Sequence, residues 1–146
     1  MEATVREILK GKEIDALWTI KPEATVYQAL EKMADKNIGA LPVVQDDSLV
    51  GIFSERDYAR KITLHGRSSK EVKVYEIMTE DVLGVKPTHT ARACLSLMTE
   101  NHIRHLPVME DDAMIGIISI GDVVKQIISN QQVRINQLEY YITQKP

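Results

Sequence analysis

The chain has 146 residues, enough for one ordinary domain or two very small ones, and 44% of them are hydrophobic, which is sufficient for a buried core. Its 21 acidic and 18 basic residues give a net charge of -3, so no broad positive field is available to attract a nucleic-acid backbone. The longest apolar runs fall far short of the roughly 20 residues that a membrane helix needs, so we expect neither nucleic acid nor membrane as a partner.

The start of the sequence lacks the features of an exported protein. Glu2 follows Met1 directly, and no apolar signal core is present. The single Cys94 cannot form an internal disulfide, which is consistent with a reducing compartment. We therefore expect a cytoplasmic protein.

The first half of the chain predicts a strand, a helix, two strands and a helix in that order. A short strand ends near residue 20, and Thr25 then caps a helix whose apolar residues recur at helical intervals. Two apolar runs, 40–44 and 49–53, flank a polar turn and predict a hairpin. Ser54 lies where the cap of a second helix belongs.

The second half of the chain repeats the first. After a short polar linker, residues 85–123 align without a gap to residues 20–58, and 15 of the 39 aligned pairs are identical. A shorter echo precedes each copy, since 5–9 matches 74–78, but four additional residues around 11–17 separate it from the first copy. A pattern that occurs twice at matched spacing indicates two related structural units.

The elements predict an α+β fold of two tandem β-α-β-β-α repeats. We place the first repeat at residues 1–66, a linker at 67–73, the second repeat at 74–130 and a C-terminal helical tail at 131–146. A unit of about 60 residues buries little surface alone, so we expect the copies to pack face to face with pseudo-twofold symmetry and a cleft between them. The tail should dock on its own module or on a second subunit.

The order of motifs resembles a known family. Leu-Pro-Val precedes the hairpin and Gly-x-x-Ser-x-x-Asp follows it in both copies, and this set is similar to the tandem CBS-domain pair, or Bateman module. Residues 53–61 also resemble small stand-alone bacterial CBS-pair proteins. The resemblance implies a flat, commonly dimeric module that binds AMP, ATP, NAD or S-adenosylmethionine in the cleft between the repeats.

Each copy has a serine and an aspartate three residues apart at a strand-to-helix junction, Ser54 with Asp57 and Ser119 with Asp122. One interpretation is a capping box with an acidic residue in the first helical turn. The other is a binding site, where N–H groups and a hydroxyl meet a phosphate and the carboxylate accepts hydrogen bonds from ribose hydroxyls. By resemblance, Asp57 and Asp122 are the ribose clamps, and both interpretations can hold together.

Basic residues distinguish the two copies. Arg104 and His105 stand where the first copy has Gly39 and Ala40. By resemblance, this position lies at the cleft, where basic residues meet phosphates, and arginine can bind phosphate oxygens bidentately. The alternative for both residues is a solvated loop before a strand.

Three further cations, Arg56, Arg60 and Lys61, lie in the first turns of a helix, where a positive charge opposes the dipole and indicates a nearby anion. For Arg60 and Lys61, a solvated helix face explains the sequence equally well. By resemblance, the adenine pocket is lined near the first strands, and the candidates are Ile20, Lys21, Ala40, Val85 and Lys86. The alternative for the aliphatic candidates is simply core.

Metal binding and catalysis have weaker support. Cys94 falls on an apolar helix stripe and belongs in a core, and His102 and His105 have no evident third ligand, so no metal is expected. The acidic pairs at 46–47 and 111–112 suit hairpin turns. No phosphate-binding glycine loop, nucleophile elbow, Ser-His or Cys-His pairing is found, so we expect no enzyme.

Two functional hypotheses follow from these features. The first is a homodimeric sensor whose adenine-nucleotide ligand, AMP, ATP or NAD, alters the packing between the repeats. The second is a ligand-independent dimerisation or scaffold module. Because the sequence contains no recognisable effector domain, either function would require a separate effector protein or a change in assembly state.

Overall fold

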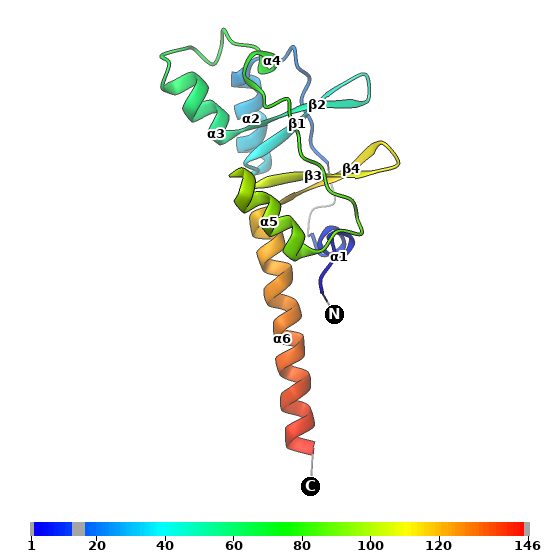
Figure 1. Ribbon diagram of the computed structural model, residues 1–146. Helices are drawn as coiled ribbons and strands as arrows, with labels where there is room; N and C mark the ends of the chain where they lie inside the picture. Colours follow the sequence, from blue (N-terminus) through cyan, green and yellow to red (C-terminus); the bar gives the residue numbers. More distant parts are fainter. Residues whose placement is uncertain (1, 13–16, 145–146) are drawn as a thin grey trace. The chain divides into compact units, whose positions relative to one another are not determined.

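The computed structural model describes residues 2–12 and 17–144 of the chain (Figure 1). Helices alternate with two separate two-stranded antiparallel sheets, which confirms the α+β fold class. The elements in chain order are α1 (Val5–Lys10), α2 (Val26–Lys36), β1 (Ala40–Gln45), β2 (Ser48–Ser54), α3 (Glu55–Asp57), the π-helix η1 (Tyr58–Thr63), α4 (Val74–Ile77), α5 (Ala91–Asn101), β3 (His105–Glu110), β4 (Ala113–Ser119) and α6 (Ile120–Gln144).

The chain forms two compact units, each with its own hydrophobic core. The first-repeat unit takes in the described residues of 16–83, and the second-repeat unit takes in those of 1–15 and 84–146. Phe53 and Leu41 are fully buried in the first core, and Ile118 and Leu106 are fully buried in the second. Two cores of matching composition are what a duplicated sequence predicts.

The first long helix of each repeat begins at a threonine cap, which the sequence predicts at Thr25. The Thr25 hydroxyl accepts the N–H of Gln28 at 3.1 Å, while the Gln28 side chain accepts the N–H of Thr25 at 2.9 Å, so α2 begins with a capping box. Thr90 caps α5 by accepting the N–H of Ala93 at 3.0 Å. Both helices end at a residue in the left-handed conformation, Asn37 and His102.

The two hairpins close through the predicted acidic turns. In the first, Asp46 and Asp47 have φ values of 50° and 64°, and Asp111 and Asp112 in the second have 51° and 66°. Two successive positive φ values match the right-handed twist of the flanking strands, and aspartate tolerates this conformation better than most residues. The interpretation of these carboxylates as turn residues is therefore confirmed.

The first strand of each repeat is shorter than the sequence pattern suggests. Ile20 forms a single parallel bridge to Val43, in which the Ile20 N–H donates to the Pro42 carbonyl at 3.0 Å. Val85 forms the equivalent bridge to Val108. The pairing stops there because a proline follows two residues later in each copy and has no N–H to donate.

The short echo before each repeat packs on the other repeat. Residues 2–12 join the second-repeat unit, where Thr4 bridges Thr90. In the same way α4 joins the first-repeat unit, where the Val74 N–H donates to the Ala24 carbonyl at 2.8 Å. The compact units therefore differ from the repeats divided along the sequence at 1–66 and 74–130.

The segment expected as a helical tail is continuous with the last helix of the second repeat. Both belong to α6, which is a single helix of 25 residues. Its first turns pack on α5, α1 and β4 of the same unit, with Val123 fully buried. In the described part of the chain, no helix combines the length and the apolar character needed to cross a membrane.

Candidate functional site

The junction between β2 and α3 carries the first serine–aspartate pair. The Ser54 hydroxyl accepts the N–H of Asp57 at 3.2 Å, and the Asp57 carboxylate accepts the N–H of Ser54 at 2.9 Å. The predicted capping box is thus confirmed. Asp57 is only 8% exposed, and a charge removed from water to this extent needs a compensating partner.

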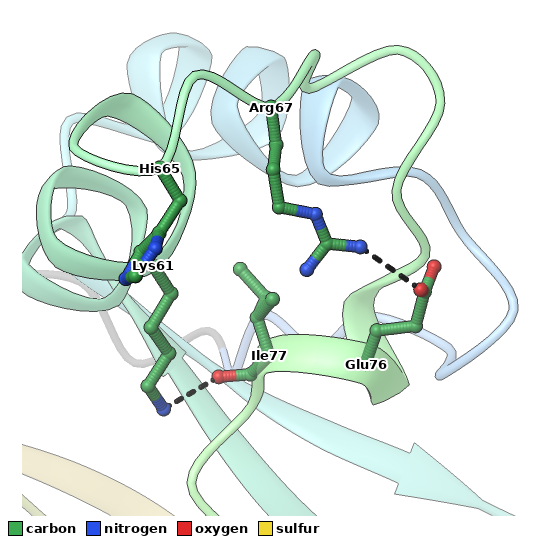
Figure 2. A pocket seen from close by; sticks show the side chains of 5 residues that line it. All are labelled: Lys61, His65, Arg67, Glu76 and Ile77. Atoms are coloured by element: carbon green, nitrogen blue, oxygen red, sulfur yellow. Dashed lines mark hydrogen bonds and ion pairs between the residues drawn. The ribbon is translucent and has the colours of Figure 1, made fainter.

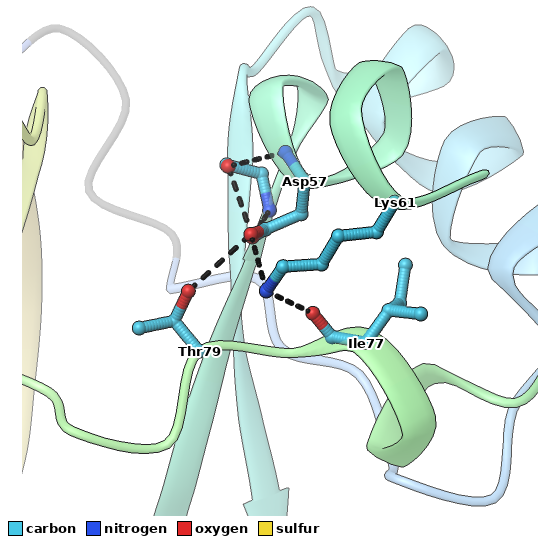
Figure 3. A network of polar contacts seen from close by, with 5 residues as sticks. Asp57, Lys61, Ile77 and Thr79 are labelled. Carbon is cyan, nitrogen blue, oxygen red and sulfur yellow. Dashed lines mark hydrogen bonds and ion pairs between the residues drawn. The ribbon is translucent and has the colours of Figure 1, made fainter. Parts of the chain in front are cut away.

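Lys61 and Thr79 supply that compensation (Figure 3). The ammonium group of Lys61 lies 3.1 Å from Asp57 Oδ1 and also donates to the Ile77 carbonyl at 2.8 Å. The Thr79 hydroxyl donates to the same carboxylate oxygen at 3.3 Å. Asp57 is therefore held between the helix that follows it and the segment after α4.

The π-helix η1 brings Lys61 into this position. It starts directly after Asp57, and its wider turn is visible in the hydrogen bonds from Leu64 N–H to Ala59 O at 3.2 Å and from Arg67 N–H to Ile62 O at 3.1 Å. Ile62, the residue after Lys61, is buried in the core of the first-repeat unit. This packing fixes the turn, and with it the direction of the lysine side chain.

The second-repeat unit has the same arrangement at Ser119 and Asp122. The Ser119 N–H donates to Asp122 Oδ2 at 2.9 Å, and the Asp122 N–H donates to the Ser119 hydroxyl at 3.1 Å. Here the lysine is Lys12, whose ammonium group lies 3.1 Å from Asp122 Oδ2 and donates to the Ile117 carbonyl at 2.7 Å. The position equivalent to Lys61 by the repeat offset is Gln126, so the two lysines have different origins.

Arg104 and His105 lie beside the second serine–aspartate pair. His105 is the register partner of Ser119 in the β3–β4 hairpin, and the Ile120 N–H donates to the Arg104 carbonyl at 2.8 Å. In the first-repeat unit, Ala40 and Gly39 hold the equivalent places. The second repeat therefore gathers a serine, an aspartate and three basic side chains at one helix start.

The local environment sets the protonation of Asp122 and His105. Burial alone would raise the pKa of Asp122, but the Ser119 N–H and the Lys12 ammonium outweigh it, so this pKa lies below its usual value. Burial lowers the pKa of His105; Asp122 opposes that effect, while Lys12 and Arg104 add to it. At neutral pH the site therefore combines an ionised carboxylate with a neutral imidazole.

The remaining candidates divide between surface and core. Arg56, Lys21 and Lys86 are exposed. Ala40 and Val85 are 3% and 1% exposed, and Val85 belongs to the hydrophobic core of its unit. Ile20 is partly buried and packs against the core of the first-repeat unit.

An open hollow of about 330 Å³ adjoins Lys61 (Figure 2). Its lining residues are Lys61, His65, Arg67, Glu76 and Ile77. Arg67 is paired with Glu76 at 3.1 Å, and the hydrogen bond from the Lys73 N–H, aided by Arg67, keeps the pKa of Glu76 below its usual value. Lys61 and Arg67, the lysine and the arginine that line the hollow, are therefore already paired with carboxylates.

Metal ligands do not cluster within the described ranges. No group of three or more His, Cys, Asp or Glu side chains there could hold an ion. Cys94 is fully buried in the second core, as its place on an apolar stripe predicts, and burial raises the pKa of its thiol.

Sequence reasoning missed Lys12 and Thr79 and left Lys61 undecided. Lys61 could have been found by its helical spacing of four residues from Asp57. Lys12 had a weaker signal, because it falls within the additional residues that separate the first echo from the first copy. Thr79 had no signal in the sequence, because only the antiparallel bridge between Thr79 and Ile52 brings it close to Asp57.

The family model for the CBS domain matches the chain twice, at residues 3–64 and 74–129. These matches cover most of the chain, and the chain belongs to the CBS-domain family.

Relatives agree with this assignment. CBS domain-containing protein CBSX3, mitochondrial, from Arabidopsis thaliana is 42% identical over 147 residues, covering 95% of this chain and 71% of that protein. The solved structure of a CBS-domain protein from Burkholderia ambifaria MC40-6 superposes with a TM-score of 0.85 at 48% identity, covering 88% of this chain and 96% of that one. The chain is thus similar to CBS-pair regulatory modules.

Two other solved structures bear on ligands and assembly. The CBS domain pair of protein MJ0100, in complex with 5′-methylthioadenosine and S-adenosyl-L-methionine, shares the fold with a TM-score of 0.76 at 22% identity, covering 89% of this chain and 99% of that chain. A hexameric CBS-CP12 protein from bloom-forming cyanobacteria is 30% identical with a TM-score of 0.74, covering 85% of this chain and 71% of that chain. Some CBS neighbours are therefore oligomeric, and one binds adenosine compounds.

Proposed function

We propose that this chain is a non-enzymatic regulatory module that binds an adenine nucleotide through its two serine–aspartate junctions. The observation that carries the proposal is the duplicated arrangement in which a carboxylate next to a helix start is kept oriented by a lysine and a serine N–H. The same arrangement occurs in both units, although its lysine comes from unrelated sequence positions. We infer that both sites require an aspartate that is charged and fixed in orientation. A cap alone needs no lysine.

In this proposal Asp57 and Asp122 accept hydrogen bonds from ribose hydroxyls. A carboxylate can accept several hydrogen bonds, so it can hold a ribose and keep its lysine. Ile20, Ala40 and Val85, with the backbone at Lys21 and Lys86, are the proposed surroundings of the adenine.

Phosphate recognition is proposed for Arg104, His105 and Lys12 in the second repeat, with Arg56 as the candidate in the first. Arg104 is exposed and its guanidinium suits a bidentate contact to phosphate oxygens. The first repeat has Gly39 and Ala40 in the equivalent places. We therefore expect two unequal sites, of which the second prefers the more highly charged ligand.

The neighbour solved with two adenosine compounds supports an adenosine ligand for this fold, and AMP, ATP and NAD are the proposed candidates here. We further propose a homodimer that signals to a separate effector protein. A cytoplasmic location is proposed from the sequence; the Arabidopsis relative, by contrast, is named as mitochondrial.

The test is a binding panel of AMP, ADP, ATP, NAD, NADH and S-adenosylmethionine, read by thermal shift and then by calorimetry. A ligand that binds the folded chain raises its melting temperature. Asp57→Asn and Asp122→Asn keep the shape of the cap and should weaken the best ligand about ten- to a hundredfold, because each removes a charge-assisted hydrogen bond. Asp35→Asn, on the exposed face of α2, is the matched control.

A 2′-deoxy analogue of the best ligand makes the test specific to ribose. It should bind the unmodified chain more weakly than the parent nucleotide does, and the difference should shrink in the variant whose aspartate holds that hydroxyl. If no member of the panel shifts the melting temperature, the sensor is overturned in favour of the scaffold hypothesis.

A further inference from the structure

The C-terminal part of α6 extends beyond the core of its own unit. At 1.5 Å per residue its 25 residues span about 37 Å. Only the first turns pack on the unit, through Val123 and Ile127. Residues 131–143 are all exposed, and Figure 1 shows this part of α6 continuing past α5 and α1.

The exposed helix carries an apolar seam with a period of seven residues. Ile128, Ile135 and Ile142 are spaced seven apart and are 59%, 47% and 69% exposed. Val124 lies four residues before Ile128 and Leu138 lies between Ile135 and Ile142, at the complementary positions of the same repeat, and both are exposed. In heptad notation the isoleucines occupy position a, and Val124, Gln131 and Leu138 occupy position d.

The seam lies on a different face from the one that packs on the unit. The packed residues, Val123 and Ile127, fall at positions c and g of the heptad, whereas the seam consists of positions a and d. A solvated helix with such a stripe is marginal in water, and burial against another helix would stabilise it. Away from the seam, polar side chains hydrogen-bond along the helix, from Gln132 to Asn136 at 2.9 Å and from Gln126 to Asn130 at 2.9 Å.

We propose that α6 pairs with α6 of a second copy of this chain as a parallel two-stranded coiled coil. Isoleucine at a with leucine at d favours two parallel strands; here isoleucine occupies a at 128, 135 and 142, and leucine occupies one of the three d positions, 138. In the parallel register, Gln131 meets Gln131 across the axis. In an antiparallel pair that aligns the whole seam, it would instead face an isoleucine, leaving a polar amide against an apolar side chain.

The charges beside the seam fit the same partner. Arg134 falls at position g and Glu139 at position e of the following heptad. In a parallel pair, the g residue of one helix faces the e residue five positions later on the other, so Arg134 meets Glu139 twice by symmetry. This complementarity specifies a second copy of α6 and its direction.

The first experiment measures self-association of the full chain by sedimentation equilibrium. The double variant Ile135→Glu and Leu138→Glu places like charges inside the seam and should weaken the dimer about a hundredfold or more. Val133→Glu adds one glutamate at position f, away from the seam, on a side chain that is 52% exposed, and should leave association unchanged. Unchanged melting temperatures at dilutions where all three proteins are monomeric verify that the units remain folded.

The second experiment tests direction by oxidative cross-linking. Leu138→Cys should form a disulfide between copies, because equivalent d residues face each other in a parallel pair, whereas Val133→Cys should not. In an antiparallel pair that aligns the whole seam from Val124 to Ile142, the two 138 positions would lie about 15 Å apart along the axis, beyond disulfide reach. Undiminished association of the double glutamate variant, or an absence of cross-linking at 138, would overturn the proposal.

Discussion

Lys12 and Asp122, which lie near opposite ends of the sequence, form an ion pair with an Nζ–Oδ2 distance of 3.1 Å, and Lys61 and Asp57 form the corresponding pair at the same distance. In both units the lysine also donates to a main-chain carbonyl, of Ile117 or of Ile77. The contact is repeated in space although the lysines occupy unrelated positions in the two copies. A feature rebuilt from different residues indicates that both aspartates need a neighbouring cation.

Removing the Lys12 ammonium should destabilise the second-repeat unit. The Lys12→Met variant keeps the aliphatic stem but leaves Asp122, whose side chain is 28% exposed, without its cation. We expect a loss of about 1 kcal/mol in the free energy of unfolding and a rise in the pKa of Asp122, measured by urea denaturation and by carboxyl NMR titration. Lys10→Met, at an exposed position in α1, is the control; equal stability of the two variants would argue against a role for the pair.

Two equivalent glycines should respond differently to substitution by alanine. A Cβ at Gly51 would lie 2.9 Å from the Thr79 carbonyl oxygen and 2.7 Å from Met78 Sδ, whereas a Cβ at Gly116 would meet only Leu9 Cδ2 at 2.7 Å. A flexible leucine can move, but the main chain at Thr79 cannot move without disturbing its bond to Asp57.

We therefore expect Gly51→Ala to cost about 2–3 kcal/mol and Gly116→Ala about 1 kcal/mol or less, measured by urea denaturation. Leu9→Ala in the Gly116→Ala background should relieve the second clash. A similar cost for both glycine variants would contradict the assignment of the tighter contact to the main chain.

Acid should destabilise the chain through His105. Its pKa in the folded chain lies below the ordinary value of 6.5, so the unfolded chain binds protons more readily. The stabilising contribution of His105 is complete above pH 6.5 and is lost as the pH falls toward the pKa of the folded state. Asp122, whose pKa is also lowered, adds a loss of the same sign at more acidic pH.

A series of urea denaturation curves between pH 8 and pH 5 measures this dependence. His105→Asn removes the titrating group and should flatten the upper part of the profile, and His65→Asn, at an exposed position, is the control. If the free energy of unfolding of the His105→Asn variant fell with pH as steeply as that of the unmodified chain, the assignment of this pH dependence to His105 would be refuted.

If a phosphate binds at Arg104 and His105 as proposed, binding should be coupled to proton uptake. The negative charge would raise the pKa of His105 from its lowered value, so affinity should increase as the pH falls from about 8 to about 6. Calorimetry in two buffers of different ionisation enthalpy measures the protons taken up. The effect should disappear for adenosine, which has no phosphate, and in the His105→Asn variant.

Local chemistry made much of the fold predictable, but contacts between distant segments did not have an equally clear signal. Thr25 with Gln28 and Ser54 with Asp57 are capping pairs whose partners lie three residues apart, so the sequence contains the whole interaction. Lys12 finds its partner only after the echo segment has docked on the second repeat. The π-turn at Lys61 likewise depends on burial of Ile62, which propensity along one helix does not encode.

The first strands illustrate a limit of hydrophobic pattern. Ile20 and Val85 are apolar and precede a turn, as a strand end should, yet each forms one bridge because Pro22 and Pro87 cannot donate. At the site, the spacing of three residues paired Ser119 with Asp122, whereas Arg104 and His105 were placed at the site by resemblance to the family. The hairpin register sets His105 opposite Ser119.

The docking of α1 and α4 on opposite repeats makes the two halves interdependent for their integrity. A protein severed in the loop at Gly66 would give an N-terminal fragment without the α4 segment that covers Gly51, and a C-terminal fragment without the Leu9 side chain that covers Gly116. Neither fragment would contain all the residues of one compact unit, so we expect the two fragments to fold stably only when they are mixed. Each compact unit is therefore completed by a segment that the sequence attaches to the other copy of the motif.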